Sequence, residues 1–280
     1  MTIFVTGASG FLGRATVSLL LRDGQNVVAA TRSCALFPVQ VSSRCVLDYG
    51  QLRAESDDDS LIHLAETRDL SAVEAAGSEI MTQAAATLQK LLEQPWRKVI
   101  YASSAIVYGD AVASPRRPDE TVSPESIYGK SKKACEDLVL SQYGSVARFA
   151  NLVGSGMASG NVLSDIMKQQ SGPGPIVLRN CSPVRDFLAV EDAAAGLLAI
   201  LKSGERGIFN FGSGCGISVD ELVHLVLAAW GQHGRPITET APSAVRSHLV
   251  LDIGSSERRL GWRPQIALRE VIASLLRKSP

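Results

Sequence analysis

The sequence predicts an α/β protein in which a doubly wound parallel sheet is followed by a smaller C-terminal α+β lobe. Up to about residue 150, short β-branched apolar runs alternate with longer segments whose apolar residues recur at helical spacing. The strand segments are almost continuously apolar, which is typical of strands covered by helices on both faces. Beyond residue 151, loops rich in Gly, Ser and Pro at 154–160 and 171–175 mark a different region.

The predicted elements of the first region follow one another in βα order. Strands are expected at residues 3–6, 26–30, 44–47, 60–65, 98–103 and 145–150, and helices at residues 11–22, 72–93 and 124–143. Asp23-Gly24 and Gln94-Pro95 end the first two helices. Ser123 is the expected N-cap of the third helix, with Pro124 in its first turn.

In the second region, a helix at 190–201 and a strand at 207–211 are expected to return to the first sheet. Ser218 and Glu221 fit a capping box that opens another helix, and a last helix is expected at 268–276. These assignments predict two interleaved units. The first comprises residues 1–150 with about 186–212, and the substrate-binding lobe comprises 151–185 and 213–280.

Composition excludes several classes of protein. Lys+Arg and Asp+Glu both total 28, so no basic field is expected to attract nucleic acid. No apolar run is long enough to span a bilayer, and the first residues lack the basic start of a signal peptide. The five cysteines are scattered and form no metal-ligand pattern with the four histidines. We therefore expect a cytoplasmic protein with reduced thiols, no metal, and neither membrane nor nucleic-acid partners.

A glycine-rich loop joins the first predicted strand to the first helix. Its glycines are Gly7, which permits a tight turn, Gly10, which lets backbone N–H groups approach a pyrophosphate, and Gly13, which allows close helix packing. The helix N-terminus adds unpaired donors and a partial positive charge. The loop therefore predicts a Rossmann fold that binds a nicotinamide dinucleotide.

The end of the second strand indicates which dinucleotide is bound. Folds that bind NAD usually carry an acid there, which bonds the ribose 2′-hydroxyl. Here the strand is followed by Arg32, and a guanidinium can pair with a 2′-phosphate. This residue favours NADP, with NAD as the alternative.

Tyr128 and Lys132 are four residues apart on the third predicted helix, so they project from the same face. A free phenol is too weak an acid to serve near neutral pH, and a nearby ammonium favours its ionised form. Ser103 and Ser104 end a strand at the carboxyl edge of the sheet, where open α/β sheets bind ligands. This combination predicts proton transfer coupled to hydride transfer.

Together these motifs resemble the extended short-chain dehydrogenase/reductase family, also called the NAD-dependent epimerase/dehydratase family. The resemblance covers residues 6–13, 63–65, 103–109, 128–132, 148–156, 185–187, 190–192, 210–214 and 260–264. It implies a nucleoside-diphosphate sugar as substrate. Family members often dimerise through a four-helix bundle, so the resemblance also implies a homodimer formed by the helices at 72–93 and 124–143.

The resemblance assigns roles to individual residues. Ser104, Tyr128 and Lys132 match the catalytic residues, and Lys132 also matches the residue that bonds the nicotinamide ribose. Asn151, Arg185 and Arg246 match residues that bind the substrate and its diphosphate. The expected cofactor-binding residues are Thr6, Gly7, Ser9, Gly10, Phe11, Leu12, Gly13, Arg32, Leu64, Ala65 and Lys132.

Departures from the family pattern rank the possible reactions. Ala105-Ile106 replaces the Asp-Glu pair of sugar dehydratases, and Gln83 lies near the place of a family asparagine. The missing acidic pair argues against a dehydratase. Arg32 and the compact C-terminal lobe favour, as the first hypothesis, an NADPH-dependent reductase of a nucleotide-linked 4-keto-6-deoxy sugar. The alternatives are an NAD-dependent nucleotide-sugar 4-epimerase and a non-catalytic dinucleotide sensor.

Overall fold

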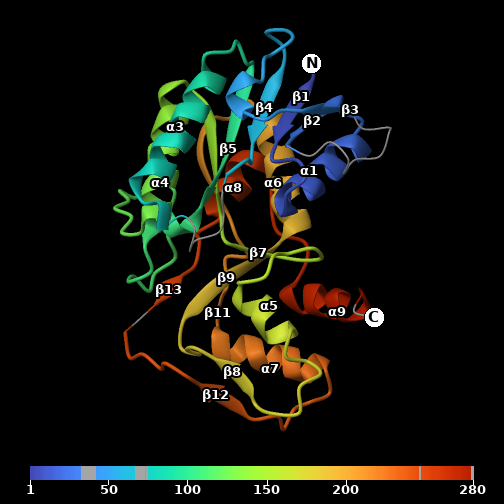
Figure 1. Ribbon diagram of the computed structural model, residues 1–280, viewed down its shortest axis with the longest axis vertical. Helices are drawn as coiled ribbons and strands as arrows, with labels where there is room; N and C mark the ends of the chain where they lie inside the picture. The colour runs from blue at the N-terminus through green and yellow to red at the C-terminus, as the bar shows by residue number, and fades with distance from the viewer. Residues whose placement is uncertain (33–41, 67–72, 74, 246, 279–280) are drawn as a thin grey trace.

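The computed structural model describes residues 1–32, 42–66, 73, 75–245 and 247–278, which form two stacked units (Figure 1). In the first unit a seven-stranded parallel sheet of described residues has the order β10-β6-β5-β4-β1-β2-β3. Its strands are β1 (Ile3–Thr6), β2 (Val27–Thr31), β3 (Ser42–Cys45), β4 (Ser60–His63), β5 (Lys98–Ser104), β6 (Ser145–Phe149) and β10 (Gly207–Phe211). The predicted doubly wound α/β fold is confirmed.

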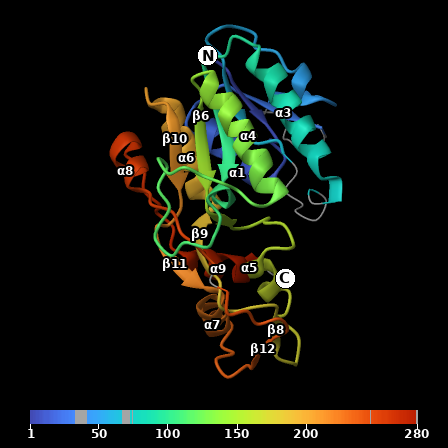
Figure 2. The ribbon, with the colours of Figure 1, turned by 90° about the vertical axis from the view of Figure 1, so that its left-hand side faces the viewer.

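Two pairs of helices cover the faces of this sheet (Figure 2). Helices α1 (Phe11–Arg22) and α6 (Val190–Lys202) pack on one face through residues such as Leu20 and Leu197. Helices α3 (Ser78–Leu92) and α4 (Ile127–Ser141) cover the other through residues such as Leu88 and Val139. Burial on both faces explains the nearly continuous apolar strands in the sequence.

Two predicted helix starts differ from the structure. Helix α4 begins at Ile127, and its N-cap is Ser126, whose hydroxyl accepts a hydrogen bond from the Gly129 N–H at 3.0 Å. The predicted cap at Ser123, with Pro124 in the first turn, is wrong. Both serines satisfy the local capping rule. Pro124, however, lies outside the helix and packs against Gly129, so closely that a Cβ on Gly129 would lie 2.8 Å from the Pro124 side chain.

The start of α3 is set by a glycine. The helix predicted from residue 72 is interrupted at Gly77, whose φ of 59° lies in the left-handed region, and α3 proper begins at Ser78. A left-handed residue cannot continue a right-handed helix. Residues 72 and 74 lie outside the described part of the chain.

The second unit contains short strands and helices around a core of its own. Strands β7 (Asn151–Val153), β9 (Val184–Ala189), β11 (Gly216–Ser218) and β13 (His248–Leu249) form one sheet, and β8 (Ile176–Leu178) pairs with β12 (Ile237–Glu239). Helices α5 (Val162–Met167), α7 (Val219–Ala229) and α9 (Leu268–Lys278) complete this unit. Its core includes Ile166, Val226 and Ile272. The predicted capping box of Ser218 and Glu221 opens α7.

The chain returns from the second unit to the large sheet slightly later than residue 186. Strand β9 stays in the smaller sheet as far as Ala189, and α6 then packs beside α1. We keep the predicted two-lobe division as a proposal, with the return placed at Val190.

The C-terminal part of the chain also contributes to the first unit. After α8 (Gly254–Leu260), the buried Trp262 packs edge-to-face on Phe211 with ring centroids 4.8 Å apart. Its indole N–H donates to the Asp192 carbonyl at 3.1 Å. Residues far apart in the sequence therefore complete one core. Within the described segments, no helix is both long enough and apolar enough to cross a membrane.

Candidate functional site

The glycine loop lies at the carboxyl edge of the large sheet, against the end of β4. Gly7 has a φ of 65°, and a Cβ on it would lie 2.9 Å from the backbone of Ala65. A Cβ on Gly13 would lie 2.2 Å from the Gly7 carbonyl oxygen. These positions therefore accept only glycine, and they keep the loop flat enough for a pyrophosphate to approach the backbone.

The N-terminus of α1 opens directly from this loop. Its N-cap is Gly10, and no side chain caps the first turn, which leaves the backbone N–H groups of Phe11, Leu12 and Gly13 as donors for an anion. The neighbouring hydroxyls shape the loop: Thr6 Oγ1 lies 2.8 Å from His63 Nδ1, and Ser9 Oγ accepts from Thr31 at 2.9 Å. The loop fits a dinucleotide, and these residues would hold its pyrophosphate.

Arg32 is exposed immediately after β2, and no acid ends that strand. Tyr49, in the short 3₁₀ helix η2 (Tyr49–Gln51), lies beside the Arg32 guanidinium and the Gly7 backbone. Burial raises the pKa of Tyr49, although the charge of Arg32 acts against it. A cation and a neutral phenol therefore line the place where the adenosine ribose of a dinucleotide would lie.

The two predicted proton-transfer residues do lie together on α4. Tyr128 is half-buried in the first turn, and Lys132 is buried one turn later. Lys132 Nζ lies 5.7 Å from the centroid of the Tyr128 ring and donates to the Ala102 carbonyl at 2.8 Å. The ammonium is thus fixed between β5 and the phenol, as the four-residue spacing predicts.

Sequence reasoning missed Glu66, which pairs with this lysine. Glu66 Oε2 lies 2.6 Å from Lys132 Nζ, and Oε1 accepts a hydrogen bond from the Tyr101 hydroxyl. Burial acts against both charges, but the attraction between them outweighs it, so that the pKa of Lys132 is raised and that of Glu66 lowered. The one sequence feature that could have indicated Glu66 is its position directly after Leu64-Ala65, which were predicted to bind the cofactor at the sheet edge.

The two serines at the end of β5 face opposite sides, as neighbouring residues of a strand do. Ser103 is buried and donates to Glu136 Oε1 at 2.6 Å. Ser104 is half-buried and caps the 3₁₀ helix η3 (Ala105–Tyr108), its Oγ accepting from the Ile106 N–H at 3.3 Å. Of the pair, Ser104 is therefore the hydroxyl on the side of η3 and the first turn of α4, which pack together.

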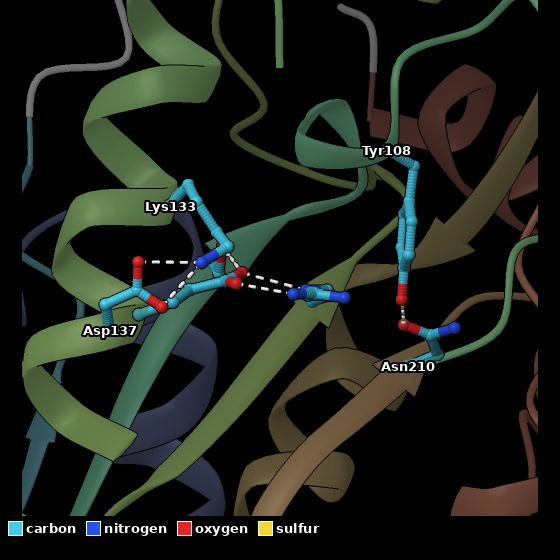
Figure 3. Close-up of polar contacts among 7 residues, drawn as sticks. Tyr108, Lys133, Asp137 and Asn210 are labelled. Carbon is cyan, nitrogen blue, oxygen red and sulfur yellow. Dashed lines mark hydrogen bonds and ion pairs between the residues drawn. The ribbon is translucent and has the colours of Figure 1, made fainter. Parts of the chain in front are cut away.

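Buried polar side chains join η3 to β10 and α4 to β6 (Figure 3). Arg148 donates twice to the Glu136 carboxylate, at 2.9 and 2.6 Å. The Tyr108 hydroxyl donates to Asn210 Oδ1 at 2.8 Å, and Asn210 Nδ2 donates to the carbonyls of Arg116 and Asp252. These bonds fix the segment that begins at Ser104.

The predicted substrate residues lie on adjacent strands of the smaller sheet. Asn151 is exposed at the start of β7, and its Nδ2 donates to the Asp186 carbonyl at 3.1 Å. On β9, Arg185 Nη2 donates to Asp110 Oδ2 at 2.9 Å and to Ser247 Oγ at 2.6 Å. Asp110 and Ser247 were not predicted. Arg246, the other expected diphosphate ligand, lies outside the described residues.

The sequence matches a family described as "NAD dependent epimerase/dehydratase family" over residues 3–212. The chain belongs to this family. The expected resemblance to this family is confirmed. The family is named for its dependence on NAD.

Individual relatives cover almost the whole chain. It is 27% identical to a UDP-glucose 4-epimerase of Halalkalibacterium halodurans over 310 residues, covering 95% of this chain and 91% of that protein. It is 22% identical to a dTDP-4-dehydro-6-deoxyglucose reductase of Escherichia coli, covering 98% of this chain and 96% of that protein. The crystal structure of a UDP-glucose 4-epimerase from Thermotoga maritima with UDP-glucose superimposes with a TM-score of 0.87, 21% identity and 99% coverage of both chains.

Gln83 lies near the place where the sequence comparison expects a family asparagine. It is exposed on α3, and its Nε2 donates to Glu79 Oε1 at 3.1 Å, one turn earlier. Across the part of the chain that the structure describes, no cluster of His, Cys, Asp and Glu could hold a metal ion. Cys45, Cys135, Cys181 and Cys215 are free thiols in that part.

Proposed function

We propose that the protein is an NAD(P)-dependent oxidoreductase that acts on C4 of a nucleoside-diphosphate sugar. The reaction we favour is reduction of a 4-keto-6-deoxy sugar by NADPH. The observation that carries the proposal is the buried ammonium of Lys132, 5.7 Å from the Tyr128 ring centroid, on a helix that packs against the strand ending at Ser104. An ammonium, a phenol and a hydroxyl at a sheet edge are suited to moving a proton on and off a sugar oxygen.

In this proposal each side chain has one task. A bound nicotinamide dinucleotide supplies the hydride. Tyr128 donates a proton to the C4 oxygen, Ser104 donates a hydrogen bond to the same oxygen, and Lys132 stabilises the phenolate that remains. The Ala102 carbonyl and Glu66 hold the lysine in place for this task.

Arg32 supports NADPH as the cofactor. It follows β2, where NAD-specific folds usually present a carboxylate, and its guanidinium is exposed beside Tyr49. Bidentate pairing with the 2′-phosphate would favour NADPH over NADH. We expect Arg32→Glu to reverse this preference, and equal affinity of the wild-type protein for both cofactors would contradict it.

Arg185 and Asn151 are proposed to bind the diphosphate, together with Arg246. Arg185 is held by Asp110 and Ser247, so its guanidinium is already oriented. A diphosphate would compete with the partly exposed Asp110 for the same donors. A phosphate can take the place of the Asp110 carboxylate, because the guanidinium group matches the geometry of carboxylates and phosphates alike.

A nucleotide-sugar 4-epimerase is the second candidate, and the relative from Halalkalibacterium halodurans supports it. The same residues would oxidise C4 and then reduce it from the other face, with no net change in the cofactor. Reductase and epimerase therefore differ in whether the nicotinamide absorbance changes when substrate is added.

The test is to measure binding of NADPH and NADH, and then turnover with nucleotide-linked 4-keto and 4-hydroxy sugars. We expect net NADPH oxidation with a 4-keto sugar. Tyr128→Phe should reduce turnover by about 10²–10⁴-fold and leave cofactor affinity unchanged, since it removes only the proton donor. Interconversion of C4 epimers without net oxidation would establish the second candidate. Cofactor binding without turnover of any sugar would support the sensor hypothesis.

We also propose that the protein is a cytoplasmic homodimer. Helices α3 and α4 lie side by side on the outside of the sheet (Figure 1), and Ala86 and Ala85 of α3 remain exposed or half-exposed there. A second copy could cover this face, because small side chains allow close helix packing. Light scattering should then give twice the chain mass, and Ala86→Glu should give the mass of one chain.

A further inference from the structure

Glu66 places a second, largely buried charge inside the proton-transfer site. Its carboxylate lies 2.6 Å from Lys132 Nζ, and it follows Ala65, whose backbone touches the glycine loop at Gly7. The carboxylate therefore shares the sheet edge with both the cofactor loop and the lysine. The mechanism above uses the lysine charge to stabilise a phenolate, and a neighbouring anion opposes that effect.

The donors of Lys132 show how closely the two charges are coupled. An ammonium has three N–H donors. One donates to the Ala102 carbonyl and another to Glu66, so one remains for the Tyr128 side. The phenol therefore faces an ammonium whose charge is largely balanced by a carboxylate. A balanced pair favours ionisation of a neighbouring phenol less than an isolated cation does.

We infer that Glu66 is a positioning residue, which holds Lys132 in place and balances its charge, so that Lys132 stabilises the phenolate of Tyr128 less than an unpaired ammonium would. This inference rests on the proposed function. It predicts that the site favours reduction of the sugar. In that direction the C4 oxygen receives a proton, and the protonated phenol of Tyr128 is a reactant.

The other titratable groups that face the pair are neutral, so they do not take over this role. On β4, burial lowers the pKa of His63 to about 4. On β5, burial and Glu66 raise the pKa of Tyr101 well above its ordinary value, which keeps its hydroxyl a donor to Glu66. On α4, burial raises the pKa of Cys135 to about 12. The charge balance around the site therefore depends on three groups, which are Lys132, Glu66 and the phenol of Tyr128.

The test compares the pH dependence of turnover in variants that alter only the carboxylate. Glu66→Gln keeps the shape and removes the charge, and Glu66→Asp keeps the charge but draws it back from Lys132. Asp137→Asn is the matched control, because it removes an ion pair with Lys133 on the exposed side of the same helix, 2.5 Å in length (Figure 3).

In the reductive direction, turnover should fall at high pH as the phenol ionises. We expect Glu66→Gln to move the midpoint of this fall to lower pH by about one unit or more, since an uncompensated charge at this distance shifts a neighbour by one to three units. Glu66→Asp should move it in the same direction by less, and Asp137→Asn should not move it. A lower rate with an unmoved midpoint in Glu66→Gln would overturn the inference. If Glu66→Gln does not fold, an unmoved midpoint in Glu66→Asp overturns it.

A measurement without substrate separates this inference from the proposed function. The tyrosinate absorbance of each protein is titrated and compared with that of its Tyr128→Phe counterpart, so that the difference reports Tyr128. The difference should develop at lower pH in Glu66→Gln than in the wild-type background. That shift in a protein that turns over no sugar would support the electrostatic role while contradicting the proposed function. No shift would contradict the role of Glu66 whatever the activity.

Discussion

Helix α4 contributes to two ion pairs one turn apart, Lys132 with Glu66 and Glu136 with Arg148. The second pair is closed off: the exposed side-chain fractions are 2% for Arg148 and 0% for Glu136, and Ser103 adds a further hydrogen bond to the carboxylate. The first pair lies at the sheet edge, where the fractions are 8% for Lys132 and 12% for Glu66. The lysine there also faces the rings of Tyr101 and Tyr128.

The two ion pairs show that the same interaction has a structural role in the interior and a functional role at the sheet edge. A pair enclosed in the interior fixes the position of α4 on β5 and β6, because separating its charges in the interior is costly. A pair at the edge can respond to a ligand, since Lys132 lies beside Tyr128 and has a third donor besides those that bond Glu66 and the Ala102 carbonyl. The helix thus joins a structural pair to a functional one through its own rigid spacing.

The largest effect is expected from Glu136→Gln, which breaks the enclosed pair. Removing one partner leaves the Arg148 charge buried without compensation, which costs about 3–5 kcal/mol of unfolding free energy. Chemical denaturation measures this loss, with Asp137→Asn as a control that should change stability by about 0.5 kcal/mol or less. Equal stability of Glu136→Gln and the wild type would show that the enclosed pair has no structural role.

Lys132→Met tests the edge pair and should act mainly on chemistry. We expect turnover to fall by about 100-fold or more, since the phenolate loses its stabilising cation. The loss of stability should be smaller than for Glu136→Gln, because Glu66 lies nearer to solvent and can take up a proton. Turnover and thermal unfolding are measured on the same sample. Unfolding as severe as that of Glu136→Gln would remove the distinction between the pairs.

The smallest effect concerns His63, which lies beside the edge pair. Burial lowers its pKa to about 4, whereas an unfolded histidine ionises near pH 6.5. The unfolded state therefore takes up a proton first as the pH falls, and the folded state loses stability between about pH 6.5 and 4. This costs about 2 kcal/mol at about pH 5. In His63→Gln the pH dependence of unfolding in this window should be weaker, and an unchanged dependence would assign it to other groups.

The sequence predicted the parts of the molecule that local rules determine. The glycine loop, the alternation of strands and helices, and the shared helix face of Tyr128 and Lys132 all depend on spacings of a few residues. The capping box at Ser218 was predicted for the same reason. These features need no knowledge of how distant segments meet.

The missed features depend on distant contacts. Glu66 meets Lys132 across 66 positions of sequence, and Arg185 meets Asp110 across 75, so no local pattern pairs them. The start of α4 was misplaced because Ser123 and Ser126 are equal by local rules, and packing of Pro124 against Gly129 decides between them. Such choices are made by tertiary structure, which overrides local preference.

The position of Trp262 has a consequence for how the chain is made. This ring closes the core of the large sheet against Phe211, yet most of the second unit lies before it in the sequence. A nascent polypeptide emerging from the ribosome can form the glycine loop and its strands early, but that hydrophobic core stays open on one side until Trp262 has emerged. The dinucleotide-binding half therefore cannot complete its core until most of the second unit has been synthesised, and a chain truncated before this residue would expose apolar surface to chaperones and proteases.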